Sequence, residues 1–175
     1  MTTKKREVKT IELFAGTQSF SAVAKQKKYR IFATDYEEID GQDLVADVRN
    51  LTYRDFPYRR PDILWASPPC EGFSVASIGA NWTGGNNAYI PRTPQALRSM
   101  DLVYNAVRLI EGIQPKWWFL ENPRGVLRKM PFMDDFLKRT GGVRHTVWYC
   151  QYGDSRAKPT DIWTNALWWK PRVAC

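Results

Sequence analysis

A cysteine and a glutamate about fifty residues apart are the residues of this sequence best suited to chemistry. Cys70 stands in the stretch ASPPCEGFS, directly after an apolar run, and Glu121 with Asn122 follows a second apolar run. Because proline fixes φ, Pro68 and Pro69 hold the backbone of Cys70 in one orientation where a strand stops. A thiolate that adds to an electrophile, beside an acid that holds a proton, indicates covalent catalysis with Cys70 as the nucleophile.

An inert buried thiol is the alternative interpretation of Cys70, because free cysteines are among the most buried residues. The double proline before Cys70 and the Glu121-Asn122 pair downstream favour the catalytic interpretation. The other two cysteines, Cys150 and Cys175, show no paired spacing, and the chain has a single histidine, so we expect no metal site. These features are typical of a protein in a reducing cytoplasm.

Short apolar runs separated by helical candidates predict an α/β fold with a mostly parallel sheet. The runs lie at residues 10–14, 30–34, 63–66 and 117–120. Residues 146–150 and 162–168 lack a helical period and predict an antiparallel pair that closes the sheet.

The clearest helix connects the strand before Cys70 to the strand before Glu121. It begins with Thr93 as N-cap and Pro94 in the first turn, and Gly112 predicts its end. One face carries apolar residues at helical spacing, namely Leu97, Met100, Val103, Val107 and Ile110. A strand, helix, strand unit crosses over right-handedly, so both strands end at the same edge of the sheet. We therefore expect Cys70 and Glu121 to lie close together.

The first two strands carry signs of a nucleoside site. Gly16 permits a tight turn after the first strand, and the helix starting near Ser19 offers backbone N–H groups to an anion. Asp35 follows Gly16 by 19 residues, the spacing at which Rossmann-like domains bind a ribose. Asp47 ends another apolar stretch and is a candidate acceptor for an adenine amino group. Each aspartate, taken alone, is more typical of a helix cap or a solvated turn than of a ligand site.

Composition favours one domain, residues 1–175, with a basic surface. The chain is 43% hydrophobic and carries a net charge of +8, which favours a polyanion such as nucleic acid, although a basic surface also serves solubility. Neither a membrane span nor a secretory signal is evident.

Residues 79–94 are rich in Gly, Asn and Pro and predict a mobile loop. The overlapping segment 78–89, with Trp82, Gly84, Gly85 and Asn86, is either a closing element or an ordinary connection.

Taken in order, the segments ELFAG, Asp35, Asp47, DILWASPPCEGFS, PKWWFLENPRG and YGDSRAK resemble the cytosine-5 DNA methyltransferase family over residues 9–165. The resemblance implies a Rossmann-like fold dependent on S-adenosylmethionine. It implies that Cys70 adds to C6 of cytosine, that Glu121 holds a proton at N3 and that Asn122 fixes its loop. It also implies a basic pair near the target base, Arg156 and Lys158, which are otherwise surface charges. The cofactor-binding positions that it implies are Phe14, Ala15, Gly16, Thr17, Asp35, Tyr36, Asp47, Val48 and Pro68.

The sequence departs from the family pattern at several positions. Thr17, Gln18 and Ser19 replace glycine-rich residues and predict a crowded approach to the cofactor. Glu71 replaces a glutamine and Pro123 a valine. The chain ends soon after the basic pair, which predicts short or absent sequence specificity unless a partner supplies target recognition.

Three functions are compatible with these features. The first is cytosine-5 methylation of DNA, with RNA or a free nucleotide left open. The second is a catalytically silent nucleic-acid-binding or regulatory protein. The third is a nicotinamide-dependent oxidoreductase, which Gly16 and Asp35 support but which lacks the full GxGxxG turn.

Overall fold

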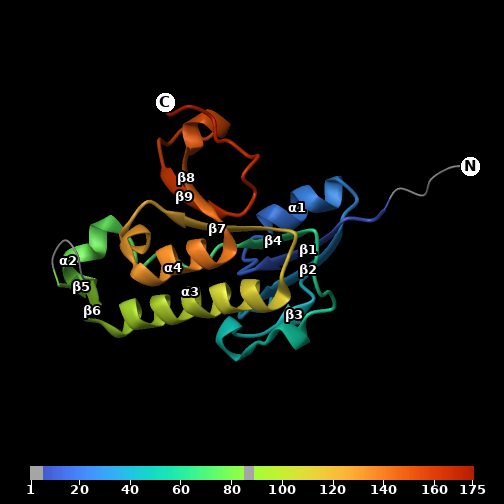
Figure 1. Cartoon of the computed structure of the whole chain (residues 1–175), viewed down its shortest axis with the longest axis horizontal. Coiled ribbons are helices and arrows are strands. Elements are labelled where there is room, and N and C mark those ends of the chain that lie inside the picture. The colour runs from blue at the N-terminus through green and yellow to red at the C-terminus, as the bar shows by residue number, and fades with distance from the viewer. Residues whose placement is uncertain (1–5, 85–88) are drawn as a thin grey trace, which may run out of the picture.

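The computed structural model describes residues 6–84 and 89–175, and its centre is a seven-stranded sheet in the order β3-β2-β1-β4-β7-β9-β8 (Figure 1). Five neighbouring strands, β3 to β7 in that order, are parallel, whereas β9 is antiparallel to both β7 and β8. This confirms the predicted parallel sheet with an antiparallel C-terminal pair. The strands are β1 (Lys9–Leu13), β2 (Arg30–Asp35), β3 (Leu44–Val45), β4 (Ile63–Ala66), β7 (Trp117–Pro123), β8 (Val143–Trp148) and β9 (Pro159–Thr164).

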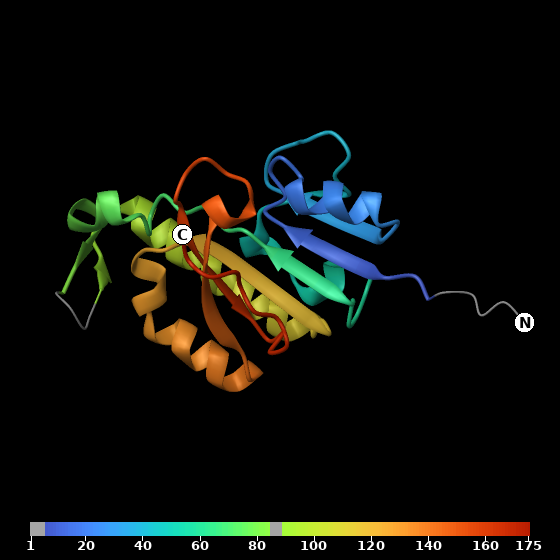
Figure 2. The ribbon, with the colours of Figure 1, turned by 90° about the horizontal axis from the view of Figure 1, so that it is seen from above.

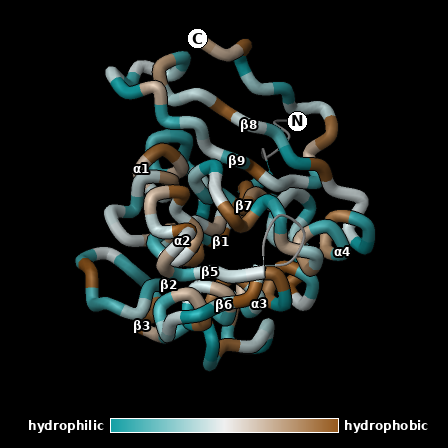
Figure 3. The backbone as a smooth tube through the Cα atoms, turned by 90° about the vertical axis from the view of Figure 1, so that its left-hand side faces the viewer, coloured by the Kyte–Doolittle hydropathy of each residue, from teal (hydrophilic) through white to brown (hydrophobic). Residues whose placement is uncertain are grey.

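The helices lie on both faces of the sheet (Figures 1 and 2). On one face, Phe20 stacks on Trp65 of β4, with ring centroids 5.7 Å apart. On the other face, Trp118 of β7 contacts Phe136, with centroids 4.6 Å apart. A hydrophobic stretch lies around β7 in the middle of the molecule, whereas the peripheral loops mix hydrophilic and hydrophobic residues (Figure 3). The helices are α1 (Ser19–Gln26), α2 (Ile78–Asn81), α3 (Pro94–Ile113) and α4 (Pro131–Thr140).

Helix α3 begins as predicted, with the Thr93 hydroxyl accepting a hydrogen bond from the Ala96 N–H. The predicted end at Gly112 is wrong, because the helix continues to Ile113 and Gln114 takes the left-handed conformation with φ 56°. A Cβ at Gly112 would lie 3.2 Å from the Tyr53 side chain, so this glycine permits close packing rather than ending the helix. The predicted apolar face is also wrong at Leu97, which is exposed.

The predicted last strand is too long at its C-terminal end, because β9 stops at Thr164. The side chain of Asn165 accepts a hydrogen bond from the Trp118 N–H and donates one to the Lys116 carbonyl. A side chain thus replaces the next backbone partner, and residues 165–169 turn away. The preceding strand also differs from prediction, since β8 covers residues 143–148 rather than 146–150.

Much of the predicted loop at 79–94 is ordered. It contains α2 and a short hairpin of β5 (Trp82–Thr83) and β6 (Ile90–Pro91). Trp82 is buried, donates a 2.6 Å hydrogen bond to the Gly72 carbonyl and stacks on Phe73. Anchoring of this kind contradicts a freely mobile segment at Trp82. Gly85 and Asn86 of the predicted closing element lie outside the described residues.

The C-terminal tail folds back on a 3-10 helix, η5 (Tyr149–Tyr152). Cys150 of η5 is disulfide-bonded to Cys175, with Cα atoms 6.7 Å apart. The Arg172 N–H also donates a 2.9 Å hydrogen bond to the Tyr152 hydroxyl. Chain reversal thus brings together two cysteines whose spacing in the sequence gave no sign of pairing. Among the helices of the described residues, none has the length and hydrophobicity that crossing a bilayer requires.

Candidate active site

The turn that carries Cys70 and the strand end that carries Glu121 lie at the same edge of the sheet. Parallel pairing of β4 with β7 sets Ala66 opposite Leu120, so the residues that follow both strands emerge together. The fully buried Asn122 amide donates a 3.0 Å hydrogen bond to the carbonyl of Pro68, two residues before Cys70. A direct bond between side chain and backbone thus joins the two segments that the sequence predicted to meet.

Cys70 is a free, half-buried thiol at the start of a tight turn. The Phe73 N–H donates to the Cys70 carbonyl at 3.0 Å, and the Phe73 carbonyl accepts from the Val126 N–H at 2.9 Å. Gly125 fits beneath this turn, because a Cβ there would lie 2.1 Å from the Phe73 carbonyl oxygen. The loop after β7 therefore supports the loop that carries the thiol.

Glu121 is half-buried, and burial raises the pKa of its carboxyl above the ordinary value, against smaller opposing effects of Tyr149 and Lys158. The Tyr149 hydroxyl donates a 3.0 Å hydrogen bond to Glu121 Oε1. Burial and the nearby Glu121 charge raise the pKa of Tyr149 to about 12. A carboxyl in these surroundings retains a proton at higher pH than a solvated one, as a general acid requires.

Tyr149 was missed by the sequence analysis. It follows β8, and its contact with Glu121 depends on β9 lying between β8 and β7. The antiparallel pair was predicted, but its order in the sheet was not, so the sequence carried no signal for this contact.

The predicted basic pair is divided. Lys158 is half-buried beside the candidate acid, with Nζ 5.4 Å from the centre of the Tyr149 ring. Arg156 is exposed, and its guanidinium binds Asp154 with nitrogen–oxygen distances of 2.9 and 3.1 Å. The structure therefore brings Lys158 to the candidate site and leaves Arg156 in a surface ion pair.

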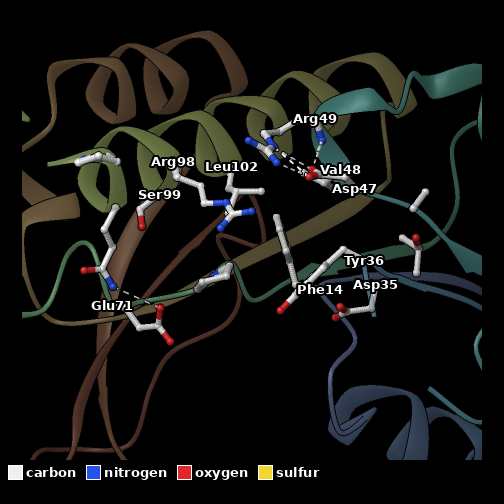
Figure 4. A pocket seen from close by; sticks show the side chains of 15 residues that line it. Phe14, Asp35, Tyr36, Asp47, Val48, Arg49, Glu71, Arg98, Ser99 and Leu102 are labelled. Carbon is white, nitrogen blue, oxygen red and sulfur yellow. Dashed lines mark hydrogen bonds and ion pairs between the residues drawn. The ribbon is translucent and has the colours of Figure 1, made fainter. Parts of the chain in front are cut away.

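A cavity of about 570 Å³ opens beside the Cys70 turn (Figure 4). Five of the predicted cofactor residues line it, namely Phe14, Asp35, Tyr36, Asp47 and Val48. Ala15, Gly16, Thr17 and Pro68 are not among the lining residues, whereas Pro69 is. The far wall comes from α3 and was not predicted, since Arg98, Ser99 and Leu102 face Phe14 and Tyr36 across the cavity (Figure 4).

The two predicted carboxylates of this cavity differ. Asp35 is held at the rim by the N–H groups of Gly16, at 2.9 Å, and Glu37, at 3.2 Å. Asp47 accepts hydrogen bonds at both oxygens from the Arg49 side chain, and these bonds lower the pKa of Asp47. Asp47 therefore lines the cavity as one half of an ion pair, and its role as an acceptor for an adenine amino group stays a prediction.

The N-terminus of α1 does not offer its N–H groups to a ligand anion, contrary to the prediction. The buried Glu12 carboxylate accepts hydrogen bonds from the N–H groups of Phe20, at 3.3 Å, and Ser21, at 2.9 Å, and from the Ser21 hydroxyl. An internal carboxylate thus occupies the place where a dinucleotide-binding domain holds pyrophosphate. This contact disfavours a nicotinamide dinucleotide.

The profile of the C-5 cytosine-specific DNA methylase family matches residues 8–131. The chain belongs to this family. Within the C-5 cytosine-specific DNA methylases, one relative is a protein of Frog virus 3 (isolate Goorha) named "Probable DNA (cytosine-5)-methyltransferase". It is 27% identical over 169 residues, which cover 95% of this chain and 74% of that protein.

Solved methyltransferase structures share the fold. Dnmt2 of S. pombe is 12% identical, with a TM-score of 0.62, covering 95% of this chain and 51% of that one. The Entamoeba histolytica methyltransferase EhMeth is 12% identical, with a TM-score of 0.64, covering 91% of this chain and 53% of that one. The present chain thus spans about half the length of these structures.

In this member of the C-5 cytosine-specific DNA methylase family, the altered first loop is anchored away from the cavity. Gln18 takes a left-handed conformation with φ 55°, and its amide donates a 2.7 Å hydrogen bond to the Asp40 carbonyl. Thr17, Gln18 and Ser19 do not line the cavity, and the predicted crowding of the approach to the cofactor stays a prediction. Glu71 does line it, and Pro123 pairs with Thr160 in the sheet.

Proposed function

We propose that this protein is a DNA (cytosine-5)-methyltransferase that forms a covalent bond between Cys70 and C6 of cytosine. The observation that carries this proposal is the hydrogen bond from Asn122 to the Pro68 carbonyl, which fixes the thiol turn beside the strand end of Glu121. Family membership supports the same reaction.

S-adenosylmethionine is the proposed cofactor, and the residues of the cavity fit it. A cavity of about 570 Å³ is in the usual range for a small-molecule site. Asp35 lines the cavity with Phe14 and Tyr36 beside it (Figure 4), and its carboxylate would accept hydrogen bonds from ribose hydroxyls. Glu12 fills the helix N-terminus, which suits a ligand without phosphate. When bound, this cofactor supplies an electrophilic methyl group.

The chain's own residues would act on the pyrimidine ring. The Cys70 thiolate adds to C6, and the electron pair of the 5,6 double bond becomes available at C5 while Glu121 gives a proton to N3. After C5 is methylated, a base removes the C5 proton, the Cys70–C6 bond breaks and Glu121 recovers its proton. Lys158, close to the carboxyl of Glu121, would provide positive charge at the edge of the pyrimidine ring.

DNA is the proposed substrate. The net charge of +8 favours contacts with DNA phosphates. Extruding a base from the duplex costs a few kcal/mol, which such contacts offset. We expect short or absent sequence discrimination, which sequencing of the methylated sites would measure. RNA and free nucleotide serve as competing substrates in the same assay.

The test is to incubate the protein with S-adenosylmethionine and DNA containing 5-fluorocytosine, whose fluorine cannot leave as a proton. We expect a denaturation-resistant protein–DNA complex that Cys70→Ser abolishes. Ala76→Ser, an exposed change near Cys70 that also adds a hydroxyl, should retain it. DNA binding without adduct or labelled methyl across a range of salt would instead identify a catalytically silent binder.

A further inference from the structure

The candidate acid has a hydrogen-bond partner that comes from the end of the edge strand β8. The Tyr149 hydroxyl lies 3.0 Å from Glu121 Oε1 and donates to it. Tyr149 begins η5, directly after β8, whereas Glu121 lies in β7, and β9 separates the two strands. Tyr149 is outside residues 8–131, the part of the chain that the family profile matches.

We propose that Tyr149 is a positioning residue that fixes the carboxyl of Glu121 and determines which of its oxygens carries the reactive proton. This inference rests on the proposed function, because it assigns Tyr149 a role in the step that Glu121 performs.

The contact is specific because the phenol donates to one oxygen only. With Oε1 accepting the phenol hydrogen, the proton of the neutral carboxyl belongs on Oε2, the oxygen that would then give it to the substrate. The phenol stays protonated throughout the working pH range, because burial raises the pKa of Tyr149 to about 12. Tyr149 therefore remains a hydrogen-bond donor while the carboxyl of Glu121 changes between its protonated and its ionised form.

The backbone around Tyr149 holds the phenol in place. The Tyr149 N–H donates to the Lys158 carbonyl at 3.4 Å, and its own carbonyl accepts from the Asp154 N–H at 3.1 Å. The adjacent Cys150 is tied to Cys175. Lys158 places its ammonium group over the Tyr149 ring. The hydroxyl thus approaches Glu121 from a braced segment, as a positioning role requires.

The phenol also opposes the effect of burial on Glu121. A hydrogen bond donated to a carboxyl favours its ionised form, so this bond lowers the pKa of Glu121 while burial raises it. Removing the hydroxyl should therefore raise the pKa of Glu121 further. This direction distinguishes a donor from a residue that only fills space.

The test compares the wild type with Tyr149→Phe, which keeps the ring. Tyr152→Phe is the matched control, because it removes a hydroxyl of the same 3-10 helix that binds the Arg172 N–H rather than Glu121. Carboxyl-carbon NMR titration of labelled glutamate gives the pKa of Glu121, its signal being assigned by its loss in Glu121→Gln. We expect this pKa to rise in Tyr149→Phe and to stay constant in Tyr152→Phe.

Kinetics provide the second measurement. In Tyr149→Phe we expect kcat to fall about tenfold with KM for DNA within about twofold, and the alkaline limb of the kcat profile to move to higher pH. An unchanged Glu121 pKa, or an unchanged kcat profile, overturns the inference while the adduct assay still supports the enzyme. A wild type that forms no 5-fluorocytosine adduct refutes the proposed function itself, and the inference falls with it.

Discussion

Glu121 is a carboxyl whose placement should reduce stability at the pH where it is ionised. Its pKa in the folded protein is raised by burial, so the folded chain binds this proton more tightly than the unfolded chain does. Stability from this group is therefore complete below the ordinary value of 4.5 and is lost as pH rises through the raised folded value.

Replacing Glu121 by Gln removes the ionisation and keeps an acceptor for Tyr149. We expect Glu121→Gln to exceed the wild type in thermal midpoint by about 2 °C or more at pH 8, and by less at pH 5. Glu71→Gln, at an exposed carboxyl, is the control and should show a constant difference. Calorimetry at the two pH values is the measurement, and a Glu121→Gln difference that shrinks with rising pH would contradict the assigned burial effect.

Asp35 should contribute to cofactor affinity through hydrogen bonds from ribose. We expect Asp35→Asn to weaken binding of S-adenosylmethionine about tenfold or more, because hydrogen bonds to charged groups are the stronger ones. Glu37→Gln, beyond the cavity lining, is the control. Isothermal titration measures the change, with circular dichroism to show that the chain as a whole remains folded. Binding within twofold of the wild type would place the ribose elsewhere.

At the scale of elements, the loop after β7 and the loop after β4 act as one support. Gly125→Ala places a methyl group against the Phe73 carbonyl, and overpacking of this kind costs about 1–3 kcal/mol. We expect urea denaturation to show this loss, together with a slower 5-fluorocytosine adduct. Gly79→Ala has no described atom within 4 Å of the new methyl and should be neutral. Equal stability of the two variants would mean that the loops do not press on each other.

The elements themselves were largely predictable, whereas their ends were less so. Thr93 and Pro94 mark the start of α3 by local hydrogen bonding and a fixed φ, and both act within a few residues. Gly112 gave a wrong helix end, and Asn165 gave no sign that the last strand stops before it. Each residue is explained by a contact with a distant segment, Gly112 with Tyr53 and Asn165 with the start of β7.

At the scale of the whole molecule, the chain order of strands and right-handed crossovers sufficed to bring Cys70 and Glu121 to one edge. Side-chain contacts between remote segments could not be predicted in this way. Tyr149 beside Glu121, the α3 wall of the cavity and Glu12 beneath α1 leave no periodic pattern in the sequence. The cysteine pair is of the same kind.

The pairing of Cys150 with Cys175 gives a simple measurement on the intact chain. We expect thiol titration of the unreduced, denatured protein to count one thiol, that of Cys70, and to count three after reduction. Cys175→Ser should give two without reduction. Three thiols in the unreduced wild type would show that the tail is not covalently attached to η5.

The bond from Asn122 to the Pro68 carbonyl has a dynamic consequence. One amide links two strand ends that are about fifty residues apart in sequence, so local opening of either end must break the same contact. Amide protons of the loop after β4 and of the loop after β7 should then exchange with solvent in a correlated manner. A bound nucleobase that slows exchange in one loop should slow it in the other. The site would respond to its substrate as one cooperative unit.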